Sequence, residues 1–194
     1  MRDKYKATVY NIGFFGEGPY KANIKGKQTK RYKVWNSMIQ RCYDLKFQSK
    51  NPWYVGCEVD VKWHNYQNFA KWFEENYIEG FELDKDLLIM NNKIYGPNTC
   101  SFIPKEINNL LVTRKKSRGN YPIGVSKLGK KFLTQMSIYG KLTKLGIFTT
   151  TEEAFKCYKA KKEEFIIEIS NKYKDLIPNK IYKNLINYKI NINN

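Results

Sequence analysis

An alternating stretch in the C-terminal half constrains the fold of this chain most strongly. Apolar and polar residues alternate from residue 131 to 139, which is the period-2 pattern of a strand with one buried face. The pattern places Phe132, Thr134, Met136 and Ile138 on one face, and Leu133, Gln135, Ser137 and Tyr139 on the other. The pairs Gly129-Lys130 and Gly140-Lys141 bound the stretch where hairpin turns belong. This predicts an antiparallel hairpin on each side of the central strand.

A helix signal follows the strands. A third strand over 142–148 leads to Thr150, and Glu153 three positions later completes a capping box. Apolar residues then recur at helical spacing and form one stripe, Ala154, Tyr158, Phe165 and Ile169. The sequence therefore predicts three antiparallel strands packed on one long helix.

The charge of this region is one-sided. No Asp or Glu lies between Glu106 and Glu152, yet the interval carries nine basic residues: Arg114, Lys115, Lys116, Arg118, Lys127, Lys130, Lys131, Lys141 and Lys144. Solvated surfaces usually mix both signs, whereas a block of one sign favours a polyanion such as a nucleic acid. A merely lysine-rich surface in a lysine-rich protein is the alternative.

The whole chain has 194 residues and a formal net charge of +17, which favours nucleic acid or another anionic partner. Its apolar fraction of 42% is enough for one large or two small cored domains. It has no run of apolar residues long enough to span a membrane and no signal-peptide pattern. We therefore expect a cytoplasmic, intracellular protein with neither a membrane partner nor a small-molecule substrate.

The four cysteines, Cys42, Cys57, Cys100 and Cys157, form no C-x-x-C pair, and the chain has a single histidine. Zinc sites need closer ligand spacing, so we expect buried free thiols and no structural zinc.

The residues GVS, KKF, GK and LG-I-F-TT-EEA between Gly124 and Ala154, with Tyr158, resemble the APETALA/ethylene-response-factor DNA-binding domain. That family has phage and homing-endonuclease relatives. The resemblance implies that the outer sheet face enters the major groove while the helix packs behind it. The outward positions that it assigns are Ser126, Leu128, Gln135, Ser137, Leu142 and Lys144. The arginines and tryptophans that the family usually carries there are absent, so guanine-reading arginines are missing.

The predicted nucleic-acid contacts combine these outward positions with the surrounding basic residues. They are Arg114, Lys115, Lys116, Arg118, Ser126, Lys127, Lys130, Lys131, Gln135, Ser137, Lys141 and Lys144.

The first half of the chain predicts helices and strands of its own. A helix starting near Arg31 has the apolar stripe Trp35, Met38, Ile39 and Cys42, and a helix capped by Asn65 has Phe69, Trp72, Phe73 and Tyr77. Residues 57–63 alternate like a strand. Residues 58–86 hold eight carboxylates and three basic residues, so they form either a solvated face or a divalent-metal site.

Several spaced motifs resemble phage-type HNH endonucleases over residues 31–111. They are Trp35-x-x-Met38-x-x-x-Cys42, Val61-x-Trp63, Asn68-Phe69-x-x-Trp72, Glu82-Leu-Asp-Lys-Asp86, Tyr95-Gly-Pro-Asn-Thr-Cys100, Phe102-x-Pro104 and Asn108-Asn109. Such a site uses a histidine to activate water and a metal ion to stabilise the leaving oxygen. The resemblance places Asp84 at the metal-ligand position and Lys85 at the base position, while Thr99 and Leu111 stand where asparagine or histidine is usual.

The candidate catalytic residues are therefore Asp84, Lys85, Asp86 and the single histidine, His64, with Asp84 as ligand of Mg²⁺ or another divalent metal. A lysine with the ordinary pKa of about 10.4 is protonated at neutral pH, which makes Lys85 a better phosphate contact than a base. His64 lies outside the motif and is more often structural in such a setting.

The predicted fold is α+β, an HNH-like helix and hairpin core followed by the sheet and helix module. The expected parts are a basic arm (1–30), an HNH-like domain (31–112), a basic linker (113–120), an APETALA-like domain (121–178) and a tail (179–194). The leading hypothesis is a phage- or prophage-encoded, double-stranded DNA-binding protein of the HNH or homing-endonuclease type with a degenerate nuclease site. An active, metal-dependent DNA endonuclease and an RNA-binding or nucleoid-coating protein are the alternatives.

Overall fold

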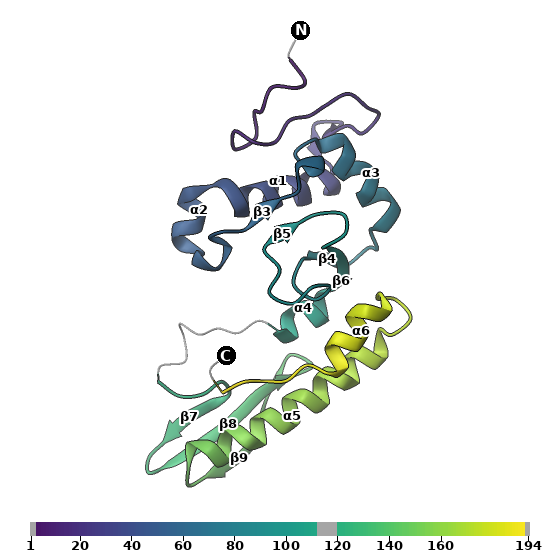
Figure 1. The fold of residues 1–194 in the computed structure, drawn as a ribbon. Coiled ribbons are helices and arrows are strands. Elements are labelled where there is room, and N and C mark those ends of the chain that lie inside the picture. The colour runs from purple at the N-terminus through teal and green to yellow at the C-terminus, as the bar shows by residue number, and fades with distance from the viewer. Residues whose placement is uncertain (1–2, 112–119, 193–194) are drawn as a thin grey trace. The chain divides into compact units, whose positions relative to one another are not determined.

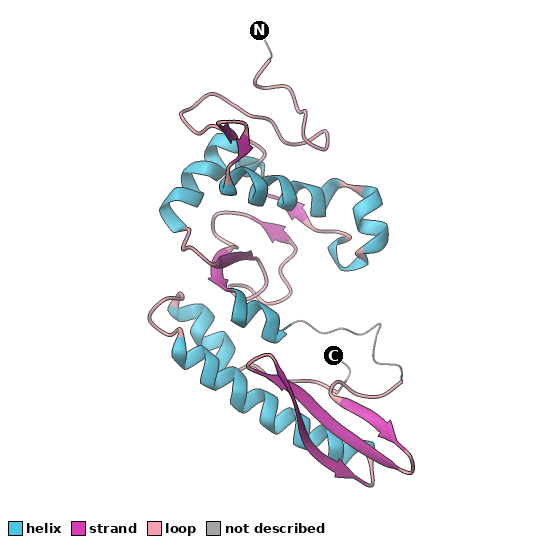
Figure 2. Cartoon of the chain, turned by 180° about the vertical axis from the view of Figure 1, so that it is seen from behind, coloured by secondary structure: helices cyan, strands magenta, loops and turns pink. Residues whose placement is uncertain are grey.

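The computed structural model describes residues 3–111 and 120–192, and the chain divides into two compact units, Met1–Ile103 and Pro104–Asn194 (Figure 1). The fold is α+β, and it contains the predicted three-stranded antiparallel sheet packed against a long helix (Figure 2). The expected basic linker, 113–120, lies outside the described residues except for Asn120.

The first unit contains short elements. In chain order they are β1 (Asn23–Ile24), β2 (Lys27–Gln28), α1 (Lys30–Tyr43), α2 (Leu45–Lys50), the 3-10 turn η1 (Pro52–Tyr54), β3 (Glu58–Val59), the 3-10 turn η2 (Val61–Trp63), α3 (Tyr66–Asn76), β4 (Phe81–Asp84), β5 (Ile94–Tyr95) and β6 (Ser101–Pro104). Strand β1 pairs antiparallel with β2, β3 pairs parallel with β5, and β4 lies beside β6.

Aromatic packing between α1 and α3 forms the core of this unit. The predicted cap of α3 is present, since the side chain of Asn65 accepts a hydrogen bond from the Gln67 amide. Trp35 is fully buried, and its indole nitrogen donates to the Trp63 carbonyl at 2.7 Å. Phe69 packs edge-on against Trp63. Of the predicted stripe on α3, Phe69 and Phe73 are therefore core residues, whereas Trp72 and Tyr77 are half-buried.

The strand expected over 57–63 is only partly formed. Extended pairing stops at Val59, because the side chain of Asp60 accepts a hydrogen bond from the Lys62 amide at 2.9 Å and turns the chain into η2. The alternation puts Val61 on the same side as Cys57, Val59 and Trp63, which are buried, but Val61 is 73% exposed. The local side-chain to backbone bond thus prevails over the alternating pattern.

The N-terminal residues expected as a basic arm are fixed onto this core. The backbone of Phe14 exchanges hydrogen bonds with the flanks of α3, from its amide to the His64 carbonyl and from the Tyr66 amide to its carbonyl, both at 2.9 Å. The Gln67 side chain bonds both the amide and the carbonyl of Tyr20 at 3.0 Å.

The second unit contains α4 (Lys105–Leu111), β7 (Val125–Leu128), β8 (Lys131–Ile138), β9 (Lys141–Phe148), α5 (Thr151–Lys172) and α6 (Asn179–Ile186). Helix α4 belongs here although the sequence motifs place it with the first half: Glu106 accepts hydrogen bonds from Lys172 at 2.7 Å and from Tyr173 at 2.8 Å. The predicted capping box, Thr150 with Glu153, begins α5. Buried Ile181 and Leu185 dock α6 on α5.

Candidate nucleic-acid interface

The sheet has one covered face and one open face. Helix α5 packs against β8 and β9, where Thr134 is 0% and Met136 4% exposed (Figure 2). Directly opposed residues in an antiparallel sheet point to the same side. The register therefore assigns to the other side, which we call the open face, Ser126, Leu128, Lys131, Leu133, Gln135, Ser137, Leu142, Lys144 and Ile147. The face assignment made from sequence alternation is confirmed for the central strand.

The register divides the basic residues that the sequence groups together. Lys131 and Lys144 lie on the open face, whereas Lys127 pairs with Phe132 and Lys141 with Ile138, so both project to the side of α5. Lys130 lies in the β7–β8 turn. All five lysines are exposed. Ser126, Gln135 and Ser137 lie on the open face as expected, while the predicted contacts Arg114, Lys115, Lys116 and Arg118 lie outside the described residues.

Gly124 joins the start of β7 to the middle of β8. Its carbonyl accepts hydrogen bonds from the Gln135 amide at 3.0 Å and the Thr134 hydroxyl at 2.9 Å. Its φ of +76° is in the left-handed region, and a Cβ there would lie 2.0 Å from a ring carbon of Tyr158. Only glycine lets the backbone approach the aromatic ring this closely.

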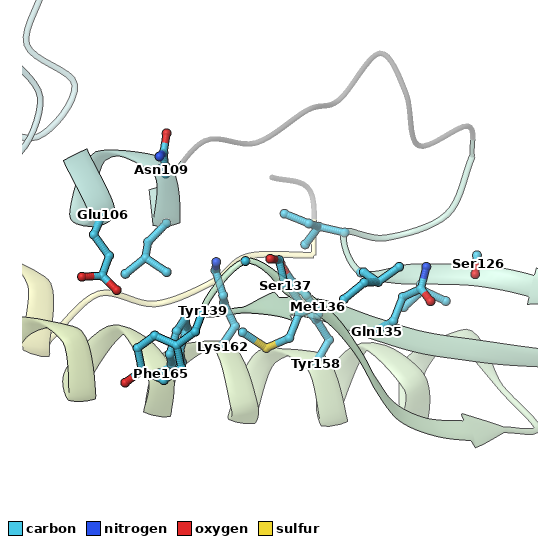
Figure 3. A pocket seen from close by; sticks show the side chains of 16 residues that line it. Glu106, Asn109, Ser126, Gln135, Met136, Ser137, Tyr139, Tyr158, Lys162 and Phe165 are labelled. Carbon is cyan, nitrogen blue, oxygen red and sulfur yellow. The ribbon is translucent and has the colours of Figure 1, made fainter.

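Beyond Gly124, strand β7 no longer covers the edge of β8, and a hollow of about 850 Å³ lies there (Figure 3). Its lining mixes open-face side chains such as Gln135 and Ser137 with Tyr158 and Phe165 of α5. The hollow therefore joins the open face to the helix side within the second unit.

Lys162 points from α5 into this hollow (Figure 3). The described residues give its ammonium group no hydrogen bond or ion pair, and burial lowers its pKa. Sequence reasoning missed Lys162, although a signal existed: it occupies the gap between Tyr158 and Phe165 in the otherwise apolar stripe of α5. A partly desolvated, unpaired cation beside an open sheet edge adds to the attraction of this surface for anions.

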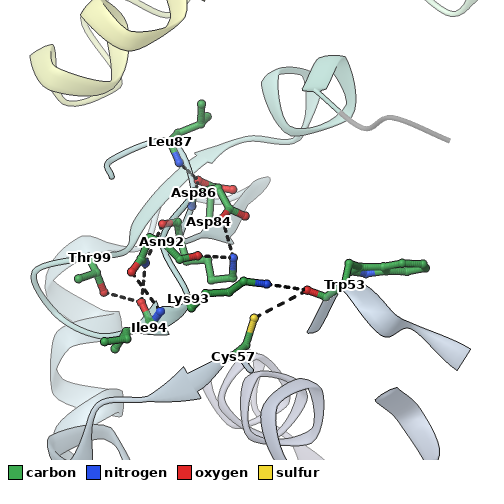
Figure 4. Close-up of polar contacts among 10 residues, drawn as sticks. Trp53, Cys57, Asp84, Asp86, Leu87, Asn92, Lys93, Ile94 and Thr99 are labelled. Atoms are coloured by element: carbon green, nitrogen blue, oxygen red, sulfur yellow. Dashed lines mark hydrogen bonds and ion pairs between the residues drawn. The ribbon is translucent and has the colours of Figure 1, made fainter. Parts of the chain in front are cut away.

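The HNH-like carboxylates form part of a network of polar contacts at the end of β4 (Figure 4). We call the segment from β4 to its partner strand β6 the hairpin, although it encloses a long loop that contains β5. One oxygen of Asp84 accepts the amides of Asp86 at 3.0 Å and Leu87 at 2.7 Å, which is a turn-forming arrangement. Burial raises the pKa of Asp84 above its ordinary value. Lys85 is 7% exposed; its ammonium donates to the Asn92 carbonyl at 2.8 Å and pairs with Asp86.

The other positions singled out by the HNH resemblance also have local partners. His64 Nε2 donates to the Val59 carbonyl at 2.9 Å, since a carbonyl can only accept, and the ring lies edge-on to Tyr43. Thr99 donates to the Ile94 carbonyl at 2.7 Å. Leu111 belongs to the second unit. In the part of the chain that the structure describes, no hydrogen bond joins the His64 ring to the side chains of Asp84 or Lys85.

No group of three or more His, Cys, Asp or Glu side chains that could hold a metal ion occurs among residues 3–111 and 120–192. One oxygen of Asp84 accepts backbone amides of the same segment, and one oxygen of Asp86 pairs with Lys85. The four cysteines are free, three of them buried and Cys157 half-buried, and burial raises the pKa of Cys42 and Cys100 to about 12.

Comparison of the chain with protein-family models, with curated proteins and with solved structures gives no match. Within the described residues, no helix has both the length and the apolar character needed to cross a bilayer.

Proposed function

We propose that this chain binds double-stranded DNA and that the open face of the β7–β9 sheet is its contact surface. The observation that carries the proposal is the unpaired positive charge of the sheet. Its five lysines, Lys127, Lys130, Lys131, Lys141 and Lys144, make no ion pair with any described residue, and residues 107–151 contain no carboxylate.

The seven carboxylates of the second unit lie outside the sheet, and in the described part of the chain three of them form ion pairs with lysines of the helices. Glu106 pairs with Lys172, and on α5 Glu163 pairs with Lys159 and Glu164 with Lys161. Among the described residues, the ion pairs of this unit therefore involve lysines outside the sheet and none of the five sheet lysines. Binding of such unpaired lysines to DNA phosphates is favourable because it releases the counterions condensed on the DNA. The major groove admits a two-stranded β-ribbon, and adjacent strands of the open face can enter it in that way.

The hairpin contacts of the first unit support binding rather than cleavage. Asp84 directs one oxygen to two backbone amides, and Lys85 is buried with Asp86 and the Asn92 carbonyl as partners. A lysine held in this way is a poor general base, because a base must reach the proton that it abstracts. We therefore propose that the HNH-like hairpin stabilises the first unit and does not cleave DNA.

Two matched double variants test the proposal. Lys131→Ala with Lys144→Ala removes two charges from the open face, and Lys127→Ala with Lys141→Ala removes two from the side of α5. Binding to a fluorescent DNA duplex is measured by anisotropy across a range of salt concentrations. Each phosphate that the protein no longer neutralises should make the log–log salt slope shallower by about 0.9, which gives about 1.8 for the open-face variant. The helix-side variant should change the slope less.

Equal slopes in the two double variants would refute the assignment of the open face. Absence of binding to any duplex by the unaltered protein would refute the function itself. A double-stranded RNA of the same length serves as a control, because its deep, narrow major groove does not admit a sheet. Equal affinity for the RNA would favour the RNA-binding or nucleoid-coating alternative.

A further inference from the structure

The open face exposes more aliphatic surface than phosphate binding requires. Leu128 is 47%, Leu142 65% and Ile147 40% exposed, and Leu133 is half-buried between the strands that carry them. The register places all four on the open face. A group of exposed aliphatic side chains on one face marks a contact surface, because water solvates it poorly.

Polar residues lie beside these aliphatic ones on the open face. Leu142 lies opposite Ser137, Leu128 opposite Lys131, and Gln135 opposite Lys144. The described residues give the side-chain amide of Gln135 no hydrogen bond, so it can bond a ligand through both its donor and its acceptor. The face thus offers one amide, two lysines and four aliphatic side chains.

From this composition we infer that the open face recognises thymine methyl groups and adenine edges, and so prefers A·T-rich double-stranded DNA; the inference rests on the proposed DNA-binding function. In the major groove only thymine presents a methyl group, to which aliphatic side chains can pack. Glutamine matches the adenine N6 and N7 pair. The G·C pair offers polar atoms alone to the aliphatic residues.

The residues that read G·C pairs best are missing from this face. It carries no arginine for guanine and no carboxylate for the cytosine amino group among strands β7, β8 and β9, all of which the structure describes. Lys131 and Lys144 can contact phosphates or guanine. They are only two residues, whereas four aliphatic side chains are distributed along all three strands of the open face. A protein partner would need carboxylates opposite the lysines as well as apolar groups opposite the leucines.

The inference is tested with duplexes that differ by a single methyl group per pair. Anisotropy at one fixed salt concentration compares an A·T-rich duplex, the same duplex with uracil in place of thymine, and a G·C-rich duplex of equal length. The A·T-rich duplex should bind about tenfold more tightly than the uracil duplex and more tightly still than the G·C-rich one. This comparison needs no variant protein, so it does not depend on correct folding of a mutant.

A variant then assigns the effect to the open face. Leu128→Ala with Leu142→Ala should lose most of the preference for the thymine over the uracil duplex while keeping its salt slope, since these are the two most exposed of the four aliphatic residues and their substitution leaves the core intact. Met136→Leu, on the covered face, should keep the full discrimination.

Failure of the A·T preference and failure of DNA binding give different results. Equal affinity of the unaltered protein for all three duplexes overturns the A·T preference and leaves the DNA-binding proposal standing. No binding to any of them overturns the proposed function. A protein that sediments as a dimer, and as a monomer after the double leucine substitution, would show that a second copy covers this face and would overturn the inference.

Discussion

Substitution of Gly124 by alanine tests the close contact between the backbone at the start of β7 and the ring of Tyr158 on α5. At φ +76° an alanine costs roughly 1–2 kcal/mol, because its Cβ crowds the backbone in the left-handed region. The new Cβ would also lie 2.0 Å from Cδ2 and 2.2 Å from Cε2 of Tyr158. Forcing an extra carbon into a filled site adds about 1–3 kcal/mol. The free energy of unfolding of the second unit should therefore fall by about 2–5 kcal/mol.

Gly129 supplies the matched control. Its φ is +60°, and a Cβ there meets nothing within 4 Å, so Gly129→Ala should cost only the backbone contribution of roughly 1–2 kcal/mol. Urea unfolding followed by circular dichroism compares the two variants. In a Tyr158→Ala background, Gly124→Ala should cost no more than Gly129→Ala, because Gly124 and Tyr158 act through one contact.

Equal destabilisation by Gly124→Ala and Gly129→Ala in the unaltered background would refute the reasoning. It would mean that the ring of Tyr158 does not lie over Gly124.

Substitutions at three further positions have defined outcomes. Met136→Ala, at a side chain 4% exposed, should lower stability by about 2–5 kcal/mol in thermal or urea unfolding, and a decrease below about 1 kcal/mol would place Met136 outside the core. The hydrogen bond from Lys172 lowers the pKa of Glu106, so this group stabilises the folded state above its ordinary pKa and loses that effect as the pH falls through the lowered value. Glu106→Gln should therefore reduce stability by at most about 1 kcal/mol at neutral pH and flatten its acid dependence, and an unchanged pH profile would contradict the pairing. Burial raises the pKa of Asp84, so ionisation of this group opposes folding as the pH rises from the ordinary pKa through the raised one. Asp84→Asn should therefore keep or raise stability at neutral pH, whereas Asp84→Ala should lose about 1–3 kcal/mol because the turn hydrogen bonds are lost. The opposite order of the two variants would refute the turn role.

Local signals in the sequence predict the second unit well. The capping box of Thr150 and Glu153 and the alternation along β8 each depend on neighbours a few positions away, so they survive in the folded chain. The same kind of signal is wrong over 57–63, where alternation predicts a strand but Asp60 turns the chain. Periodicity alone does not show whether a segment forms a strand or is turned by a hydrogen bond from a backbone amide to a nearby side chain.

The candidate site is predictable only in part. The faces of Gln135 and Lys144 follow from alternation, but the positions of Lys127 and Lys141 on the side of α5 depend on strand register, which a sequence does not specify directly. The hollow at Lys162 depends on where β7 stops pairing with β8.

The HNH resemblance identifies a real cluster of polar residues but not its contacts. The sequence places Asp84, Lys85 and Asp86 side by side, and the hydrogen bonds that occupy them come from backbone groups of the same hairpin, such as the Asn92 carbonyl. Residue type alone does not distinguish a turn-forming carboxylate from a metal ligand.

Side-chain NMR during titration with a DNA duplex tests the central claim most directly. We predict that the methyl signals of Leu128 and Leu142 and the side-chain amide of Gln135 shift as the duplex is added, because all three lie on the open face. The methyl signals of Ile166 and Ile169, both 0% exposed on α5, should stay in place. Shifts confined to the first unit, or to α5, with the open face unchanged would contradict DNA binding by the open face.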